Sequence, residues 1–128
     1  MYKRQIPNFT TYRCDRVAYR GGGSVIFIKK SISSTLYSNT NDRGYEEVSI
    51  LTELQQEKIK FTCLYNPPSN TLNEQDITQF FPTGIKTILG GDLNSKHSLW
   101  GCRVSNKNGK ELHKLISEND LTVFAPQS

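Results

Sequence analysis

The chain has 128 residues, a net charge of +4 and 35% hydrophobic residues. This length fits one domain with a modest core, and the composition is typical of a folded globular protein. No apolar run approaches the roughly 20 residues that a membrane-spanning helix needs, and no signal-peptide core follows the first basic residues. We therefore expect an intracellular protein without a membrane partner. Its basic character permits a polyanionic partner such as nucleic acid but does not require one.

The cysteines indicate neither a disulfide framework nor a zinc site. There are three, Cys14, Cys63 and Cys102, and they are far apart in the sequence without a Cys-x-x-Cys unit. We expect reduced thiols in ordinary packing positions.

In the first half, the pattern predicts strands separated by turns. The β-branched and aromatic run 24–28 follows three glycines and is long enough for a strand buried on both faces. Apolar and polar residues then alternate over 47–54, which predicts a half-exposed strand, and again over 58–65. The short polar stretch 55–57 between these two runs predicts a hairpin.

In the second half, strand and helix alternate. Residues 71–74 have the spacing of a capping box, and the helix that it would begin should end near 82–84. A strand over 87–89 continues to Asp92, an amphipathic helix is predicted over 110–119, and a last strand over 121–124. The order of elements predicts an α/β fold.

The strongest chemical signal is the segment from Gly90 to Asn94, where an apolar strand ends in Asp92 and Asn94. Side chains two residues apart leave an extended backbone on the same side, so this acid and this amide could face one ligand. A carboxylate can orient or deprotonate a water, and an amide can donate to a phosphate oxygen. The glycines Gly90 and Gly91 would let the backbone turn and a bulky substrate approach. The alternative is an Asx-type turn that closes the strand.

Tyr65 is a second candidate. The strand that contains it must stop at Pro67 and Pro68, which cannot continue a ladder. At such a strand end the hydroxyl of Tyr65 could reach a bound phosphate while the ring packs inward. The alternative is a core tyrosine with a solvated tip.

Together these motifs resemble the endonuclease domain of jockey-like non-LTR retrotransposon polyproteins, in the endonuclease/exonuclease/phosphatase superfamily. The resemblance extends over nearly the whole chain. It is carried by the ordered segments 12–16, 20–28, 65–68 and 90–101, with 106–112 and 119–121 fitting the same pattern.

The resemblance implies a partial two-sheet α/β sandwich of the DNase I-like type that nicks DNA with the help of Mg²⁺ or Mn²⁺. Asp92 would orient the attacking water and bind the metal, Asn94 would hold the scissile phosphate, and Tyr65 would contact it. The nick would prime reverse transcription by the polymerase part of the polyprotein, in the nucleus if the target is chromosomal DNA.

Three further residues are candidates for substrate binding, namely Asn66, His97 and Arg20. His97 could reach a phosphate, although a loop histidine satisfied by neighbouring backbone is an equal alternative. Arg20 could contact the DNA backbone or be ordinary surface charge. Trp100 is expected to pack under the loop, and we assign no role to His113.

The sequence departs from the family pattern in two places. The superfamily holds its metal with an asparagine and a glutamate on the first strands, and a later Ser-Asp-His motif faces the phosphate; neither is found here. Glu46 and Glu47 come too late to replace the missing ligand. We therefore expect residues 1–128 to be the central portion of one incomplete domain, marginally stable and catalytically feeble or inactive alone. The alternatives are a non-catalytic nucleic-acid-binding remnant and a superfamily phosphatase or phosphodiesterase acting on phosphorylated lipids or nucleotides.

Overall fold

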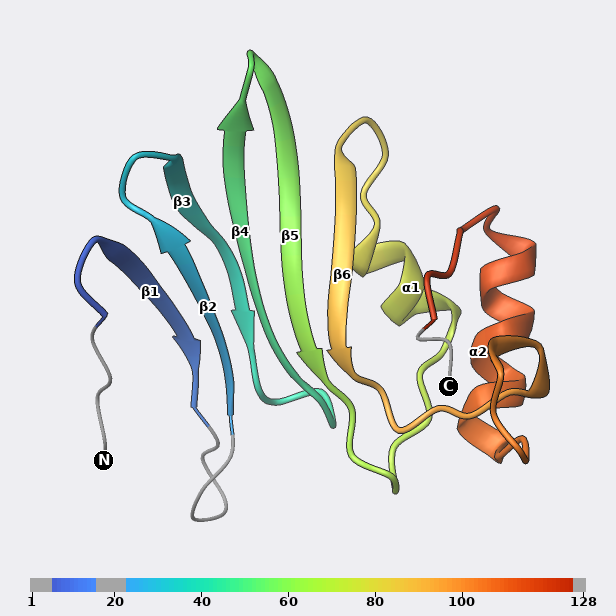
Figure 1. Ribbon diagram of the computed structural model, residues 1–128. Coiled ribbons are helices and arrows are strands. Elements are labelled where there is room, and N and C mark those ends of the chain that lie inside the picture. Colours follow the sequence, from blue (N-terminus) through green and yellow to red (C-terminus); the bar gives the residue numbers. More distant parts are fainter. Residues whose placement is uncertain (1–5, 16–22, 126–128) are drawn as a thin grey trace.

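The computed structural model describes residues 6–15 and 23–125 of the chain (Figure 1). Within these residues, six strands form two sheets. The two α-helices lie beyond the last strand, on the side away from the other strands. The elements are β1 (Phe9–Cys14), β2 (Ser24–Lys29), β3 (Ser33–Thr40), β4 (Glu46–Leu54), β5 (Glu57–Tyr65), α1 (Glu74–Phe80), β6 (Lys86–Asp92), a 3-10 turn (Ser98–Trp100) and α2 (Lys107–Glu118).

The larger sheet has the order β3-β4-β5-β6, and its last pair, β5 and β6, is parallel. β4 and β5 form the hairpin that the sequence predicts, closed by Gln55 and Gln56 with φ values of 51° and 67°. Two consecutive left-handed residues match the twist of a tight hairpin. β1 and β2 form a separate antiparallel pair. The predicted two-sheet α/β architecture is confirmed.

The predicted burial of two strands is wrong. β4 was expected to expose one face, yet Glu47, Val48 and Ser49 are all buried, because β4 is paired on both edges and also contacts β1 and β2. Its polar side chains tolerate burial because Glu47 accepts hydrogen bonds from Ser49 and from Ser38, the latter at 2.5 Å. β2 was expected to be buried on both faces, but Val25 is 42% exposed, since β2 belongs to a two-stranded sheet.

Both predicted helices are present, with shifted starts. The capping box of α1 is formed by Asn73 and Asp76 instead of the predicted residues 71–74, and the helix ends before Pro82 as expected. Thr71 instead donates to Asn108 Oδ1 at 2.8 Å. α2 starts at Lys107, three residues earlier than predicted.

The predicted strand over 121–124 is wrong. The structure has no strand between 119 and 125, and Phe124 is 94% exposed. The backbone N–H of Leu121 instead donates to Ile116 in the last turn of α2. A strand requires a neighbouring backbone to pair with, and this segment has none within the part of the chain that the structure describes.

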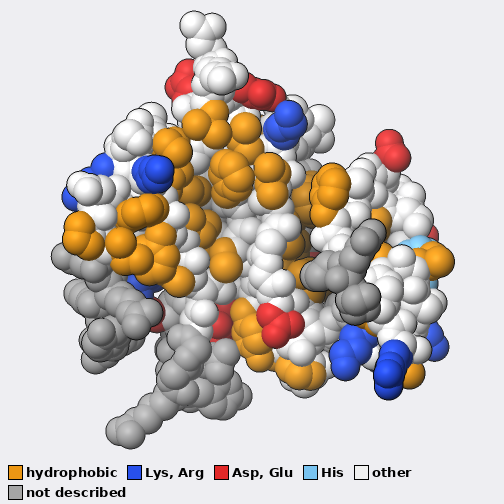
Figure 2. All heavy atoms as spheres, viewed as in Figure 1, with side chains coloured by type: hydrophobic (Ala, Val, Ile, Leu, Met, Phe, Trp, Pro, Cys, Tyr) orange, Lys and Arg blue, Asp and Glu red, His pale blue; other side chains and the backbone are white. Residues whose placement is uncertain are grey.

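The main core lies between the larger sheet and the two helices. It comprises Tyr45, Leu64, Leu72, Ile77, Phe80, Leu112 and Leu115. Other apolar groups remain exposed: Figure 2 shows hydrophobic side chains gathered over the strands, and Leu36, Tyr37 and Ile88 are each more than two-fifths exposed. No helix in residues 6–15 and 23–125 is both long and apolar enough to span a membrane.

A buried lysine gives the fold a testable pH dependence. Lys60 is 1% exposed, its Nζ donates to the Phe80 carbonyl at 2.8 Å, and the ring of Tyr37 lies 4.8 Å away. Burial lowers the pKa of Lys60 below its ordinary 10.5, and Glu47 opposes this only in part. Between the lowered pKa and 10.5 the unfolded chain binds more protons, so stability contributed by this site rises with pH in that window.

We therefore expect wild type to gain stability relative to Lys60→Met as the pH rises toward 10.5. Urea unfolding at several pH values measures the difference, and it should be constant at pH values below the lowered pKa. Lys58→Met, an exposed position on the same strand, is the matched control. A wild-type-minus-Lys60→Met difference that shows no more pH dependence than the control would contradict the assignment.

Candidate active site

Tyr65 and Asp92 are brought together by strand register. They are partners at the carboxyl ends of the parallel strands β5 and β6, and Glu46 is opposite Tyr65 on β4. Directly paired residues project from the same face of a sheet, so one row contains Glu46, Tyr65 and Asp92. Glu46 comes too late in the order of motifs to be predicted as a metal ligand, and only the strand register reveals its place in this row.

Asp92 and Asn94 are close together, but by a different route from the one predicted. β6 ends at Asp92, and Asn94 has a left-handed φ of 47°, so the pair is not part of one extended strand. Asp92 Oδ1 accepts from the backbone N–H of Asn94 at 2.9 Å, which is the Asx-type turn considered as the alternative. The turn itself therefore places the acid beside the amide.

The carboxamide of Asn94 is fixed in orientation. Its Nδ2 donates to the backbone carbonyl of Asn66 at 2.8 Å. An amide nitrogen carries two hydrogens, so the second N–H can still donate to a ligand. Asn94 is partly buried and Asp92 is exposed, which leaves both accessible.

Asn66 is not placed to touch a substrate. It is fully buried, its Nδ2 donates to the carbonyls of Asn70 and Leu93, and its Oδ1 accepts from Asn70 Nδ2. Its backbone N–H also donates to the Asp92 carbonyl at 2.8 Å. The predicted substrate contact does not fit this geometry, since these bonds occupy the side chain and bury it. Asn66 instead joins the ends of β5 and β6.

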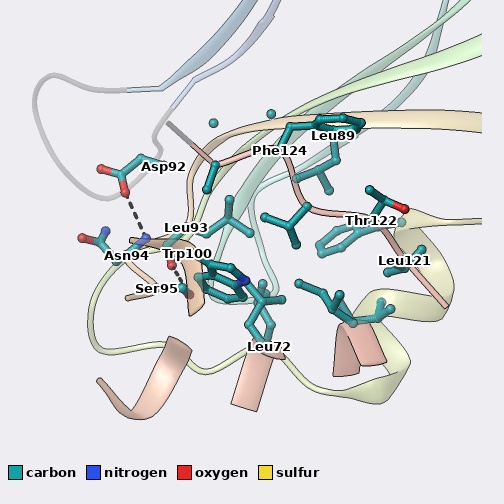
Figure 3. Close-up of a pocket in the computed structure, with 18 of the residues that line it drawn as sticks. Leu72, Leu89, Asp92, Leu93, Asn94, Ser95, Trp100, Leu121, Thr122 and Phe124 are labelled. Carbon is teal, nitrogen blue, oxygen red and sulfur yellow. Dashed lines mark hydrogen bonds between the residues drawn. The ribbon is translucent and has the colours of Figure 1, made fainter. Parts of the chain in front are cut away.

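A cavity of about 870 Å³ extends along β6 from this site. Figure 3 shows Asp92 and Asn94 at one end of it, pointing away from apolar side chains such as Leu89, Leu93 and Trp100. The cavity therefore has an apolar interior and a polar end, and the polar end carries the candidate catalytic pair.

His97 and Trp100 lie in the loop beyond Asn94. His97 Nδ1 accepts from the backbone N–H of Leu99 at 3.1 Å, so the local backbone satisfies one ring nitrogen. Its ring stacks on His113 of α2, with centroids 4.2 Å apart. Desolvation, followed by His113 and Lys110, lowers the pKa of His97, which favours its neutral form at pH 7. Trp100 packs against the core.

Two predicted features of the site, the contact from Arg20 and a complete Mg²⁺ site, are not found among the described residues. Arg20 lies outside the described residues. For the implied Mg²⁺, no group of three or more His, Cys, Asp and Glu side chains in residues 6–15 and 23–125 could hold a metal ion. Since Mg²⁺ requires near-octahedral oxygen coordination, the donors that the structure describes do not fit such a site by themselves.

The architecture is that of a DNase I-like α/β sandwich. The solved endonuclease domain of TRAS1, a telomere-specific non-LTR retrotransposon, superposes with a TM-score of 0.75 at 15% identity. The match covers 94% of this chain and 57% of that structure.

Sequence similarity identifies the family to which the chain belongs. The model of the endonuclease-reverse transcriptase family matches residues 59–128, more than half of the chain, so the chain belongs to this family. The RNA-directed DNA polymerases from mobile element jockey of Drosophila melanogaster and Drosophila funebris are 33% and 29% identical to it. Each alignment covers 94% of this chain and 13% of the relative, so the chain spans about an eighth of their length. The jockey-like resemblance is confirmed.

Proposed function

We propose that this chain is part of a retrotransposon endonuclease that nicks DNA and so supplies a 3′ hydroxyl for reverse transcription. The observation that carries the proposal is the pairing of Tyr65 with Asp92 at the ends of β5 and β6, together with the turn that places Asn94 beside Asp92. The jockey polymerases that the chain resembles support a partnership with a reverse transcriptase in the same polyprotein. If its target is chromosomal DNA, the protein acts in the nucleus.

Each of the three side chains has a role that its chemistry allows. The exposed carboxylate of Asp92 accepts a proton from, or orients, the water that attacks phosphorus. The second N–H of Asn94 donates to a nonbridging phosphate oxygen, where negative charge develops. The hydroxyl of Tyr65 contacts the same phosphate from the neighbouring strand.

A divalent cation, Mg²⁺ or Mn²⁺, would neutralise charge on the phosphate and the leaving oxygen. Asp92 is the ligand that we assign to it. Because a site with few ligands binds Mg²⁺ poorly, we expect this polypeptide by itself to nick slowly or not at all.

A plasmid-nicking assay tests the proposal. With Mg²⁺ or Mn²⁺, any conversion of supercoiled plasmid to open circles by wild type should be slow, and Asp92→Ala should fall to the protein-free background. Glu53→Gln, which removes an exposed carboxylate on β4 seven pairs along the β4–β5 ladder from Glu46 and Tyr65, is the control and should match wild type. Equal nicking by wild type and Asp92→Ala above the protein-free background would refute the assigned site, and robust wild-type nicking would refute the expected weakness.

The two alternative functions, a nucleic-acid-binding remnant and a phosphatase or phosphodiesterase, predict different experimental results. A nucleic-acid-binding remnant would bind DNA equally with and without Mg²⁺, and Asp92→Ala or Asn94→Ala would leave the affinity unchanged. A phosphatase or phosphodiesterase would release phosphate from phosphorylated lipids or nucleotides and leave plasmid intact.

A further inference from the structure

Asn106, the residue that caps α2, is bonded to the loop that follows β6. Its Oδ1 accepts from Gly109 N–H at 2.7 Å, as expected of an N-cap, and also from Lys96 N–H at 2.9 Å. Its backbone N–H donates to the Lys96 carbonyl at 3.0 Å, and its Nδ2 donates to the Asn94 carbonyl at 3.1 Å. One side chain thus connects the start of a helix to two residues of the candidate active-site loop.

Gly109 brings the helix and the loop into direct backbone contact. A Cβ at this position would overlap the carbonyl oxygen of Lys96, so only glycine permits the observed approach. Gly109 is also buried. The first turn of α2 therefore packs against the loop, and Asn106 bonds to it at the same place.

This contact matters because Asn94 adopts a left-handed conformation that must be held. Its N–H is bonded to Asp92 and its side chain to Asn66, while its carbonyl is bonded to Asn106. Asparagine tolerates a φ of 47° better than other residues with a side chain, and the surrounding bonds hold it there. Of these three bonds, only the one from Asn106 comes from outside the strand ends.

We infer that Asn106 is a positioning residue of the candidate active site, which fixes the direction of the Asn94 carboxamide through its bond to the Asn94 carbonyl. This inference rests on the proposed function only for its effect on cleavage. The effect on the loop is independent of that function and can be measured without metal or DNA.

The substitution Asn106→Asp tests the hydrogen bond from Asn106 Nδ2 to the Asn94 carbonyl separately from the capping of α2. Aspartate caps a helix as well as asparagine does and keeps the acceptor for Gly109 and Lys96, but it replaces the donor to the Asn94 carbonyl by an oxygen. Asn73→Asp is the matched control, because Asn73 caps α1 with the same kind of bond, to Asp76 N–H at 3.0 Å.

The first measurement is amide hydrogen exchange across residues 94–96. We expect Asn106→Asp to accelerate it about tenfold and Asn73→Asp to leave it unchanged, with both variants folded. Should the aspartate variant lose α2, Asn106→Ser keeps a neutral cap and is too short to replace the bond. Unchanged exchange at 94–96, or equal acceleration throughout the chain, would overturn the inference.

The second measurement is a double-mutant cycle on nicking. If Asn106 acts through Asn94, the variant with both Asn106→Asp and Asn94→Ala nicks no more slowly than Asn94→Ala alone, whereas Asn73→Asp and Asn94→Ala combine additively. Additive effects of Asn106→Asp and Asn94→Ala would overturn the positioning role. Nicking that is insensitive to Asp92→Ala would instead refute the proposed function, and hydrogen exchange would then still decide the inference about the loop.

Discussion

Gly91→Ala is expected to lower the free energy of unfolding by about 3 kcal/mol or more, a large part of the stability of an ordinary domain. Gly91 has a φ of +139°, a conformation that residues with a side chain rarely adopt. A Cβ there would overlap the backbone carbonyl oxygen of Leu64 on β5. Relief would require separating β5 from β6, whose pairing aligns Tyr65 with Asp92. Urea unfolding followed by circular dichroism measures the loss.

The adjacent glycine provides the control. A Cβ on Gly90 would have no atom within 4 Å, so Gly90→Ala should remain within about 0.5 kcal/mol of wild type. The sequence suggested one role for both glycines, a turn and an approach for substrate. The structure separates them, since only Gly91 is required by the packing of the two strands. Equal losses of stability at the two positions would show that this distinction is wrong.

The parts of the fold that local patterns encode could be predicted from the sequence. The β4–β5 hairpin follows from two alternating runs around a polar turn, and α2 follows from its apolar stripe. The burial of β4 could not be predicted, because alternation cannot reveal that both faces of Glu47–Ser49 are covered. The segment 121–124 has the composition of a strand but no partner in the described chain, and composition does not supply one.

In the candidate site, too, only the features encoded by local sequence could be predicted. Asp92 and Asn94 were recognised from a short motif, but the turn between them, not an extended strand, brings them together. The pairing of Tyr65 with Asp92 joins parallel strands separated by a helix, and residue spacing alone does not fix such a register. Asn106 could have been noticed as an asparagine preceding a helix, yet its bond to Asn94 depends on tertiary packing.

Asn66→Ala is expected to cost about 2 to 4 kcal/mol of stability. Truncation removes the partner of Asn70 Nδ2 and a donor to the Leu93 carbonyl at a position with no exposed surface. Buried polar groups that lose their partners keep their desolvation penalty, so the loss exceeds the net value of an ordinary hydrogen bond. The backbone of Asn66 also holds Asn94, so the damage should extend to the candidate site.

Asn41→Ala makes the same chemical deletion at an exposed position, where the side chain donates to the Asp15 carbonyl at 3.2 Å. Water can replace that bond, so the change should stay within about 0.5 kcal/mol. Unfolding and DNA affinity measured on both variants separate the two explanations of Asn66. If the side chain of Asn66 contacted DNA directly, Asn66→Ala would weaken DNA binding at unchanged stability. If it joins the ends of β5 and β6, as its burial indicates, the loss of stability comes first and any loss of affinity follows from it.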